Sequence, residues 1–239
     1  MTRARRVQRL LALGTGALLL LSPFPAAAAA ARTITFSGAS SAHPLTAELV
    51  RLYRRETPRP PRFSIVGGGT ATGIADAARG VVSAGLVDRP LRPDDPRGLR
   101  YLPVALSALC LATHPATPVT NVDRTELAHL PAATADADRP LLRAAFPEAT
   151  AALPAFATSA QVGEFVRATP TAWGFVDLAD ARGLNVVAVD GLPCAPAAPY
   201  PARRAYGFVT RGRPRGALAR FLRWVTRDAT AQRAIASRY

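Results

Sequence analysis

The sequence predicts an α/β fold built as two small lobes, and a repeated strand–loop–helix pattern supports this prediction. Residues 33–36 have the composition of a short strand, a loop of small residues follows, and apolar positions recur at helical spacing from Leu45. The same order repeats over 63–80, where the loop is rich in glycine. About 208 residues remain after a predicted leader, and this length favours two lobes over one core.

The first 31 of the 239 residues are expected to be a cleavable secretory signal peptide. Four arginines precede an apolar stretch at 10–21, and an alanine run at 26–31 offers several A-x-A cleavage sites. The apolar stretch is shorter than the roughly 20 residues that span a bilayer, so we expect no transmembrane span. Arg5 and Arg6 match a twin-arginine signal poorly, which favours the ordinary export route.

Composition argues against several classes of function. The formal net charge is +14, and arginine carries all the basic charge. A sequence without lysine cannot contain a Walker-type phosphate loop or perform lysine Schiff-base chemistry. The arginines are not interleaved with aromatic residues, so no nucleic-acid partner is expected, and they are either scattered solvated charges or a means of steering anions. The three histidines and two cysteines have no ligand spacing, so we expect neither a metal nor a cofactor.

Cys110 and Cys194 are the candidates for a disulfide bond. An even number of cysteines in an exported chain favours a bridge. Cys110 lies in an apolar, strand-like run, so two separate buried thiols are the alternative.

Three loops are expected to meet at one site. The carboxyl ends of parallel strands lie side by side, and strands are predicted at 33–36, 63–66 and 81–87. Small polar or acidic residues follow these strands: Ser40 and Ser41, Thr70 and Thr72, and Asp88. Glycines such as Gly69 let a ligand approach the backbone, and the amides of a first helical turn favour an anion. The alternative is that the glycine loop only joins a strand to a helix.

These loops and their order resemble the first lobe of the phosphate-binding proteins that serve ABC transporters. The matching motifs are Ser37-Gly38-Ala39-Ser40-Ser41, the glycine loop at 67–73, Asp88-Arg89-Pro90-Leu91 and Leu102-Pro103-Val104-Ala105. The resemblance implies a two-lobed, periplasmic-binding-protein-like fold of type II, with mixed sheets flanked by helices and hinge strands between the lobes. It implies lobe one over 32–105 and 204–239, and lobe two inserted over 106–203.

The resemblance also implies roles in binding. The expected ligand-binding residues are Ser40, Ser41, Thr70 and Asp88, with Gly69 and Thr72 as weaker candidates. The aspartate would accept a hydrogen bond from protonated phosphate. A carboxylate repels an anion that brings no proton, so this arrangement would select hydrogenphosphate over sulfate. The alternatives for Asp88 are a turn residue or an ion pair with Arg89.

The predicted second lobe departs from the family pattern. The family has an arginine followed closely by Ser-Gly-Thr at a helix start, and the sequence lacks this motif. Arg139 or Arg143 could supply the missing guanidinium, and Ser159 could supply a hydroxyl and an N–H group at a helix start. The ordinary interpretations are a solvated helix charge for Arg143 and a plain cap for Ser159. The resemblance resumes at 162–165 and 169–176.

The implied function is that of an exported, monomeric solute-binding protein of the periplasm. It would bind inorganic phosphate or a similar small oxyanion between the lobes and deliver it to the membrane subunits of an ABC importer. The alternative is a relative that binds another oxyanion or acts as an interaction or sensing module. We do not expect an enzyme, because the elbow-like segment at 38–42 lacks its last glycine and no histidine lies late in the chain. A dinucleotide site is disfavoured because the third glycine falls one place late.

Overall fold

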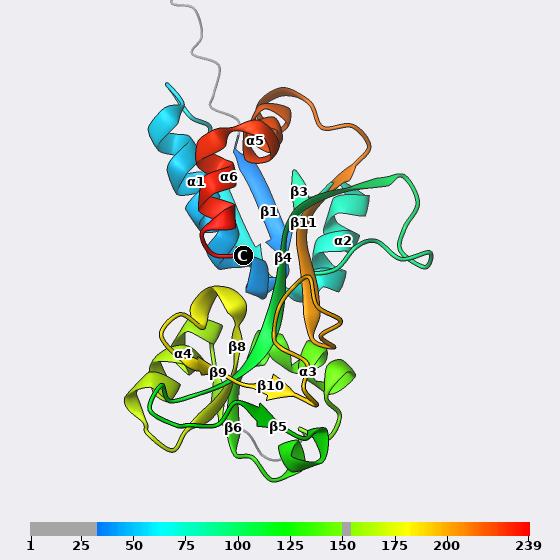
Figure 1. Ribbon diagram of the computed structural model, residues 1–239. Helices are drawn as coiled ribbons and strands as arrows, with labels where there is room; N and C mark the ends of the chain where they lie inside the picture. Colours follow the sequence, from blue (N-terminus) through cyan, green and yellow to red (C-terminus); the bar gives the residue numbers. More distant parts are fainter. Residues whose placement is uncertain (1–32, 150–153) are drawn as a thin grey trace, which may run out of the picture. The chain divides into compact units, whose positions relative to one another are not determined.

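The computed structural model describes residues 33–149 and 154–239, and the predicted signal peptide lies outside them. Nine strands form one mixed sheet in the order β2-β1-β3-β11-β4-β8-β6-β7, with β9 paired to β4 (Figure 1). The strands of this sheet are β1 (Ile34–Gly38), β2 (Phe63–Gly67), β3 (Ala84–Val87), β4 (Leu99–Thr113), β6 (Ala132–Ala135), β7 (Ala155–Phe156), β8 (Trp173–Asp177), β9 (Asn185–Val186) and β11 (Arg203–Arg211). A second, two-stranded sheet pairs β5 (Asn121–Val122) with β10 (Ala188–Val189).

Six α-helices flank the strands of the described chain. They are α1 (His43–Glu56), α2 (Gly69–Arg79), α3 (Arg139–Ala145), α4 (Ser159–Ala168), α5 (Gly216–Arg227) and α6 (Ala229–Ala236). Short 3-10 helices stand at η1 (Ser40–Ala42), η2 (Arg124–Ala128), η3 (Asp136–Asp138) and η4 (Leu178–Asp180). None of the helices in the described ranges is long and apolar enough to cross a membrane.

The first three strands have the arrangement that the site prediction needs. β1 pairs in parallel with β2 on one side and with β3 on the other. Helix α2 packs very closely against β1 and β3 at Gly73, where a Cβ atom would lie 2.6 Å from the carbonyl oxygen of Leu86. Only a residue without a side chain allows this approach, so Gly73 serves the packing of the helix.

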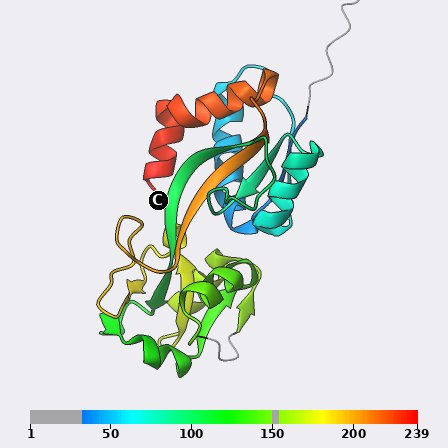
Figure 2. The same ribbon diagram turned by 90° about the vertical axis from the view of Figure 1, so that its right-hand side faces the viewer.

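Strands β4 and β11 connect two hydrophobic cores. β4 pairs with β11 from Leu99 to Ala108 and then with β8 from Leu109 onward, so one long strand enters both parts of the sheet (Figures 1 and 2). One core contains Phe36 and Phe221, and the other contains Phe146, Phe175 and Tyr200. Hinge strands between two cores are what the predicted fold class requires.

One predicted strand differs from the structure. The strand expected over 81–87 begins only at Ala84, because Gly80 ends α2 in a left-handed turn and Val81 is 65% exposed beyond it. Further along the chain, the 3-10 helix η2 begins with a capping box between Asp123 and Glu126.

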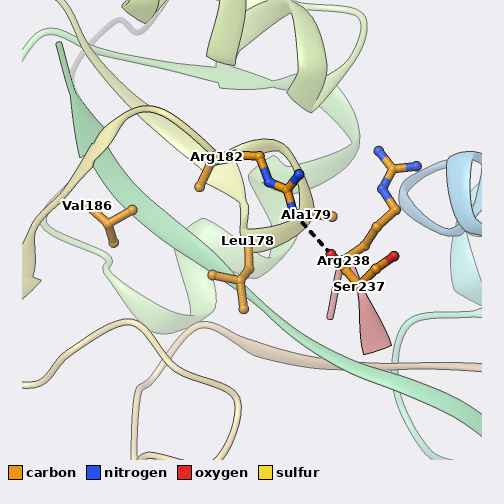
Figure 3. Close-up of a pocket in the computed structure, with 7 residues that line it drawn as sticks. Leu178, Ala179, Arg182, Val186, Ser237 and Arg238 are labelled. Carbon is orange, nitrogen blue, oxygen red and sulfur yellow. Dashed lines mark hydrogen bonds between the residues drawn. The ribbon is translucent and has the colours of Figure 1, made fainter. Parts of the chain in front are cut away.

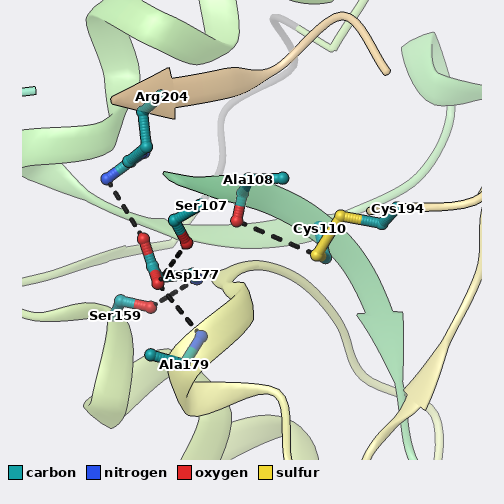
Figure 4. The surroundings of a disulfide bond; sticks show 8 residues. All are labelled: Ser107, Ala108, Cys110, Ser159, Asp177, Ala179, Cys194 and Arg204. Carbon is teal, nitrogen blue, oxygen red and sulfur yellow. Dashed lines mark hydrogen bonds and ion pairs between the residues drawn. A yellow bond between two sulfur atoms is a disulfide. The ribbon is translucent and has the colours of Figure 1, made fainter. Parts of the chain in front are cut away.

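Cys110 and Cys194 form a disulfide bond across 84 residues of sequence. Cys110 is fully buried on β4, and the bridge joins this strand to the proline-rich loop before β11 (Figure 4). The two cysteines therefore tie a long loop to the second core.

Candidate functional site

Asp88 lies where the three predicted loops meet. Ser41 Oγ donates a hydrogen bond to Asp88 Oδ2 over 3.2 Å, and Thr70 Oγ1 donates to Asp88 Oδ1. The amide of Asp88 in turn donates to Thr70 Oγ1 over 3.2 Å. Residues from the ends of β1, β2 and β3 thus share one carboxylate, as parallel strands allow.

Arg89 does not pair with Asp88. Its guanidinium makes two hydrogen bonds to the carboxylate of Asp95, over 2.7 and 2.9 Å. The hydrogen bond from Arg89, together with one from the amide of Arg92, lowers the pKa of Asp95 to about 2. The ion-pair alternative for Asp88 is therefore wrong, since Arg89 is committed to Asp95.

A cleft of about 560 Å³ opens in front of Asp88, and we call it the glycine-loop cleft. One wall is polar and consists of residues 39–41, the start of α2 at 68–71, and Asp88. The other wall comes from η3 and α3: Ala137, Pro140, Leu141 and Ala144. Four arginines also line this cleft: Arg89, Arg92, Arg203 and Arg204. Arg89 is paired with Asp95 and Arg204 with Asp138, so Arg92 and Arg203 against Asp88 give this lining its positive balance, which favours anions.

A neighbouring cleft of about 410 Å³ shares Ser40, Ser41, Ala137 and Arg204 with the first. Its other charged lining residues are Asp138, Asp177, Asp180 and Arg238, so three carboxyl groups face two guanidinium groups and we call it the acidic cleft. Burial is the main cause that raises the pKa values of Asp138 and Asp180, and the charge of Asp177 adds to it. This balance disfavours an anion compared with the glycine-loop cleft.

Arg204 is buried between the two clefts, with its side chain only 2% exposed. Its Nη1 donates to Asp138 Oδ1 over 2.9 Å and to the Tyr206 hydroxyl over 3.0 Å, and Asp177 Oδ2 lies 3.5 Å away (Figure 4). Burial opposes its charge, but Tyr206, Asp138 and Asp177 outweigh that effect and raise the pKa of Arg204. The guanidinium is therefore charged at any ordinary pH.

The other edge of the Arg204 guanidinium has no acceptor. Among the described residues, neither Nε nor Nη2 has a hydrogen-bond partner, although both are shielded from solvent. Nε and the nearer terminal nitrogen of an arginine form the fork that binds two oxygens of an oxyanion. A fork of this kind beside the cleft is able to hold two oxygens of an oxyanion.

Sequence reasoning missed Arg204, Asp138 and Asp177. A signal existed on β11, where side chains alternate between faces and Arg204 therefore shares its face with the buried residues Tyr206 and Phe208. An arginine on that face of a strand must have partners inside the protein.

Of the two weaker candidates, Gly69 lines the glycine-loop cleft, whereas Thr72 and the speculative candidates lie elsewhere or do other work. Thr72 Oγ1 donates to the carbonyl of Gly68 over 2.6 Å, within its own loop. Arg139 pairs with Asp136, and the residues lining the two clefts as described include neither Arg139 nor Arg143. The structure thus does not bring either arginine to the predicted site.

Ser159 follows the N-cap of α4 and lines the acidic cleft. Its Oγ accepts a hydrogen bond from the amide of Asp177 over 2.7 Å (Figure 4). The capping role belongs to Thr158, whose hydroxyl accepts from the amide of Gln161. Ser159 therefore holds the end of β8 rather than facing Asp88.

A third depression of about 520 Å³ lies between η4 and the end of α6. Arg182 donates there to the carbonyl of Ser237 over 3.5 Å, and Leu178 and Val186 complete an apolar side (Figure 3). Its lining contains none of the predicted site residues, so the chemistry of this depression does not bear on them.

Comparison with known proteins gives the same fold. A family model described as PBP superfamily domain matches residues 25–229. Comparison of the sequence with curated proteins finds no match. The chain therefore belongs to the PBP superfamily, and the expected family resemblance is confirmed at this level.

Solved structures show the same two-lobed type II fold. A phosphate ABC transporter substrate-binding protein from Clostridium perfringens, with bound phosphate, superposes with a TM-score of 0.70 at 17% identity, covering 87% of this chain and 98% of that one. An ABC-type phosphate transport receptor from Vibrio cholerae gives 0.67 at 16% identity, covering 86% and 98%. The C-terminal domain of a LysR family transcriptional regulator from a Rhodococcus species gives 0.57 at 16%, covering 81% and 98%. The predicted fold class is confirmed, while fold alone leaves the ligand open.

Proposed function

We propose that this chain is an exported solute-binding protein that binds an oxyanion of the phosphate class in the glycine-loop cleft and delivers it to the membrane subunits of an ABC importer. The observation that carries the proposal is the meeting of Ser41, Thr70 and Asp88 at the start of α2. The predicted leader supports a periplasmic location, and we propose that the protein acts as a monomer.

The chemistry follows from the hydrogen bonds around Asp88. In the structure, the hydroxyl groups of Ser41 and Thr70 both donate hydrogen bonds to this carboxylate. A ligand oxygen that carries a proton can donate to Asp88 instead, which releases both hydroxyls to donate to the other ligand oxygens. The first-turn amides of α2, at Gly69 and Thr70, add N–H donors and the positive end of the helix dipole. Sulfate carries no proton at neutral pH and would face Asp88 unpaired.

Arg204 would replace the guanidinium of the family motif that the sequence lacks in the second lobe. Its Nε and Nη2 edge, which has no partner among the described residues, would donate hydrogen bonds to two ligand oxygens when the lobes open around the hinge strands and close again. The positive charge would then come from strand β11 rather than from a loop of the second lobe.

The arrangement supports binding rather than catalysis. Ser41 donates to Asp88 and not to His43, the histidine nearest to it in sequence. His43 Nε2 is buried without a partner among the described residues, and burial lowers the pKa of this imidazole. A serine nucleophile needs a hydroxyl that is hydrogen-bonded to a general base. The hydroxyl of Ser41 is instead hydrogen-bonded to the Asp88 carboxylate, which also accepts a hydrogen bond from Thr70.

Titration calorimetry of the purified chain with phosphate and methyl phosphate, and with sulfate as the comparison anion, tests the proposal. We expect micromolar or tighter binding of at least one phosphate-class anion and no binding of sulfate. Asp88→Asn should reduce the discrimination against sulfate at least about tenfold, because the amide no longer requires a proton on the ligand. Asp94→Asn, which removes the same charge at an exposed position of the next loop, should leave it unchanged. No heat with either phosphate-class anion would refute the proposal.

A further inference from the structure

The second wall of the glycine-loop cleft is an apolar stripe. Ala137, Pro140, Leu141 and Ala144 follow helical spacing and line the cleft together. Three of them are exposed and Leu141 is half-buried, whereas the opposite face of α3 packs into the core through Leu142, Ala145 and Phe146. Helix α3 is thus apolar on both faces, and the face toward the cleft has no covering in the described structure.

This wall cannot solvate a bare oxyanion. Its four side chains carry no donor, and Pro140 has no amide hydrogen. A free tetrahedral anion presents oxygens on every side, and an oxygen pressed against the stripe would lose water without gaining a hydrogen bond. An organic group on that side of the ligand removes the problem and gains apolar contact.

The facing wall has the opposite character. It offers the amides at the start of α2, the hydroxyls of Ser41 and Thr70, and the carboxylate of Asp88. Arg204 lines the same cleft, is buried, and has two nitrogens without a hydrogen-bond partner in the part of the chain that the structure describes. The cleft therefore has a donor-bearing wall at α2 and a donor-free stripe at α3, and its volume, about 560 Å³, lies in the range of pockets for organic ligands.

We propose that the ligand is an organic oxyanion, a phosphate monoester or a phosphonate, rather than free phosphate. Its anionic head lies against α2, Asp88 and Arg204, and its organic substituent packs on the α3 stripe. This inference rests on the proposed function, because it specifies the ligand of the same cleft.

Calorimetry with phenylphosphonate, methyl phosphate and inorganic phosphate tests this inference on the purified chain. We expect phenylphosphonate to bind at least about tenfold more tightly than phosphate, as burial of one ring against the stripe allows. Leu141→Ser should lower that ratio at least about fivefold, and Ala144→Ser should lower it in the same direction. Val81→Ser is the matched control, since this apolar residue is 65% exposed beyond the far end of α2.

The outcomes separate the two proposals. Phosphate that binds as tightly as the organic anions, or a ratio that Leu141→Ser and Ala144→Ser leave unchanged, would overturn the inference and retain the proposed function. No binding of any of the three anions would overturn both. Thermal unfolding of each variant shows whether a lower affinity ratio of phenylphosphonate to phosphate comes from the altered cleft or from a damaged fold. The comparison of the three anions on the unaltered chain does not depend on any variant.

Discussion

Replacing Arg204 by methionine should leave a buried carboxylate without its partner. Arg204 and Asp138 both have side chains that are 2% exposed, and Arg204 Nη1 donates a hydrogen bond to Asp138 Oδ1 over 2.9 Å. Asp138 Oδ2 has no partner among the described residues. Asp177 differs, because it also accepts hydrogen bonds from Ser107 and Tyr206. The cost of Arg204→Met should therefore fall mainly on Asp138.

The loss of unfolding free energy in Arg204→Met is limited because Asp138 can take up a proton. A buried carboxyl that loses its partner can take up a proton, and this costs about 1.4 kcal/mol for each pH unit above a pKa of about 3.9. The penalty is then capped at about 4 kcal/mol at pH 7 and at about 1.5 kcal/mol at pH 5. Burial already raises the pKa of Asp138 in the folded state, so protonation stabilises the folded form below the unfolded pKa, and this advantage is lost as pH rises through the folded value. The loss of stability in Arg204→Met must therefore grow with pH.

Urea unfolding at pH 7 and pH 5 measures this effect. We expect the midpoint to fall by more than about 1 M at pH 7 and by less than half as much at pH 5. Adding Asp138→Leu should recover most of the loss, because no carboxylate then stays buried alone. Arg203→Met, at the exposed neighbouring position, is the matched control. A loss that is equal at both pH values, or below about 1 kcal/mol at pH 7, would refute the reasoning.

Three further predictions concern the frame around the site. Reducing the bond between Cys110 and Cys194 should cost about 2–4 kcal/mol of unfolding free energy, and thermal unfolding with and without reductant would show it; an unchanged midpoint would contradict the prediction. Gly73→Ala should cost at least about 1–3 kcal/mol, because its Cβ would lie 2.6 Å from the Leu86 carbonyl oxygen, and a neutral result in urea unfolding would show that α2 can move away. Carboxyl NMR should find Asp95 titrating near a pKa of about 2. Because that pKa is depressed, its contribution to stability is present above the unfolded value of about 3.9 and is lost as pH falls through about 2; titration near 3.9 would count against the ion pair.

The first lobe could be predicted in detail because its signals are local. Strand, glycine loop and helix are consecutive in the sequence, and parallel pairing then brings Ser41, Thr70 and Asp88 together without further information. The error at 81–83 was also local. The apolar residue Val81 suggested a strand, but the left-handed turn at Gly80 leaves it in solvent.

The charges of the site could not be predicted in the same way. Arg203 and Arg204 are neighbours of the same type, yet one is exposed and the other is 4% exposed as a whole residue. The difference depends on which face of β11 meets Asp138, a residue 66 positions away in the sequence. Such a pairing is set by the packing of the lobes, and no local pattern contains it.

In the proposed complex, the position of Arg204 would let Asp138 act on the ligand without touching it. Nη1 is held by Asp138 and Tyr206, and the planar guanidinium then fixes the direction of its free Nε and Nη2 edge. Asp138 stands at the end of η3, immediately before α3, whose apolar stripe forms the opposite wall of the cleft. A shift of α3 would therefore move the apolar stripe on this helix and the Nε and Nη2 edge of Arg204 together. We expect that the two halves of an organic oxyanion are recognised as one unit, because the same residue connects the elements that bind them.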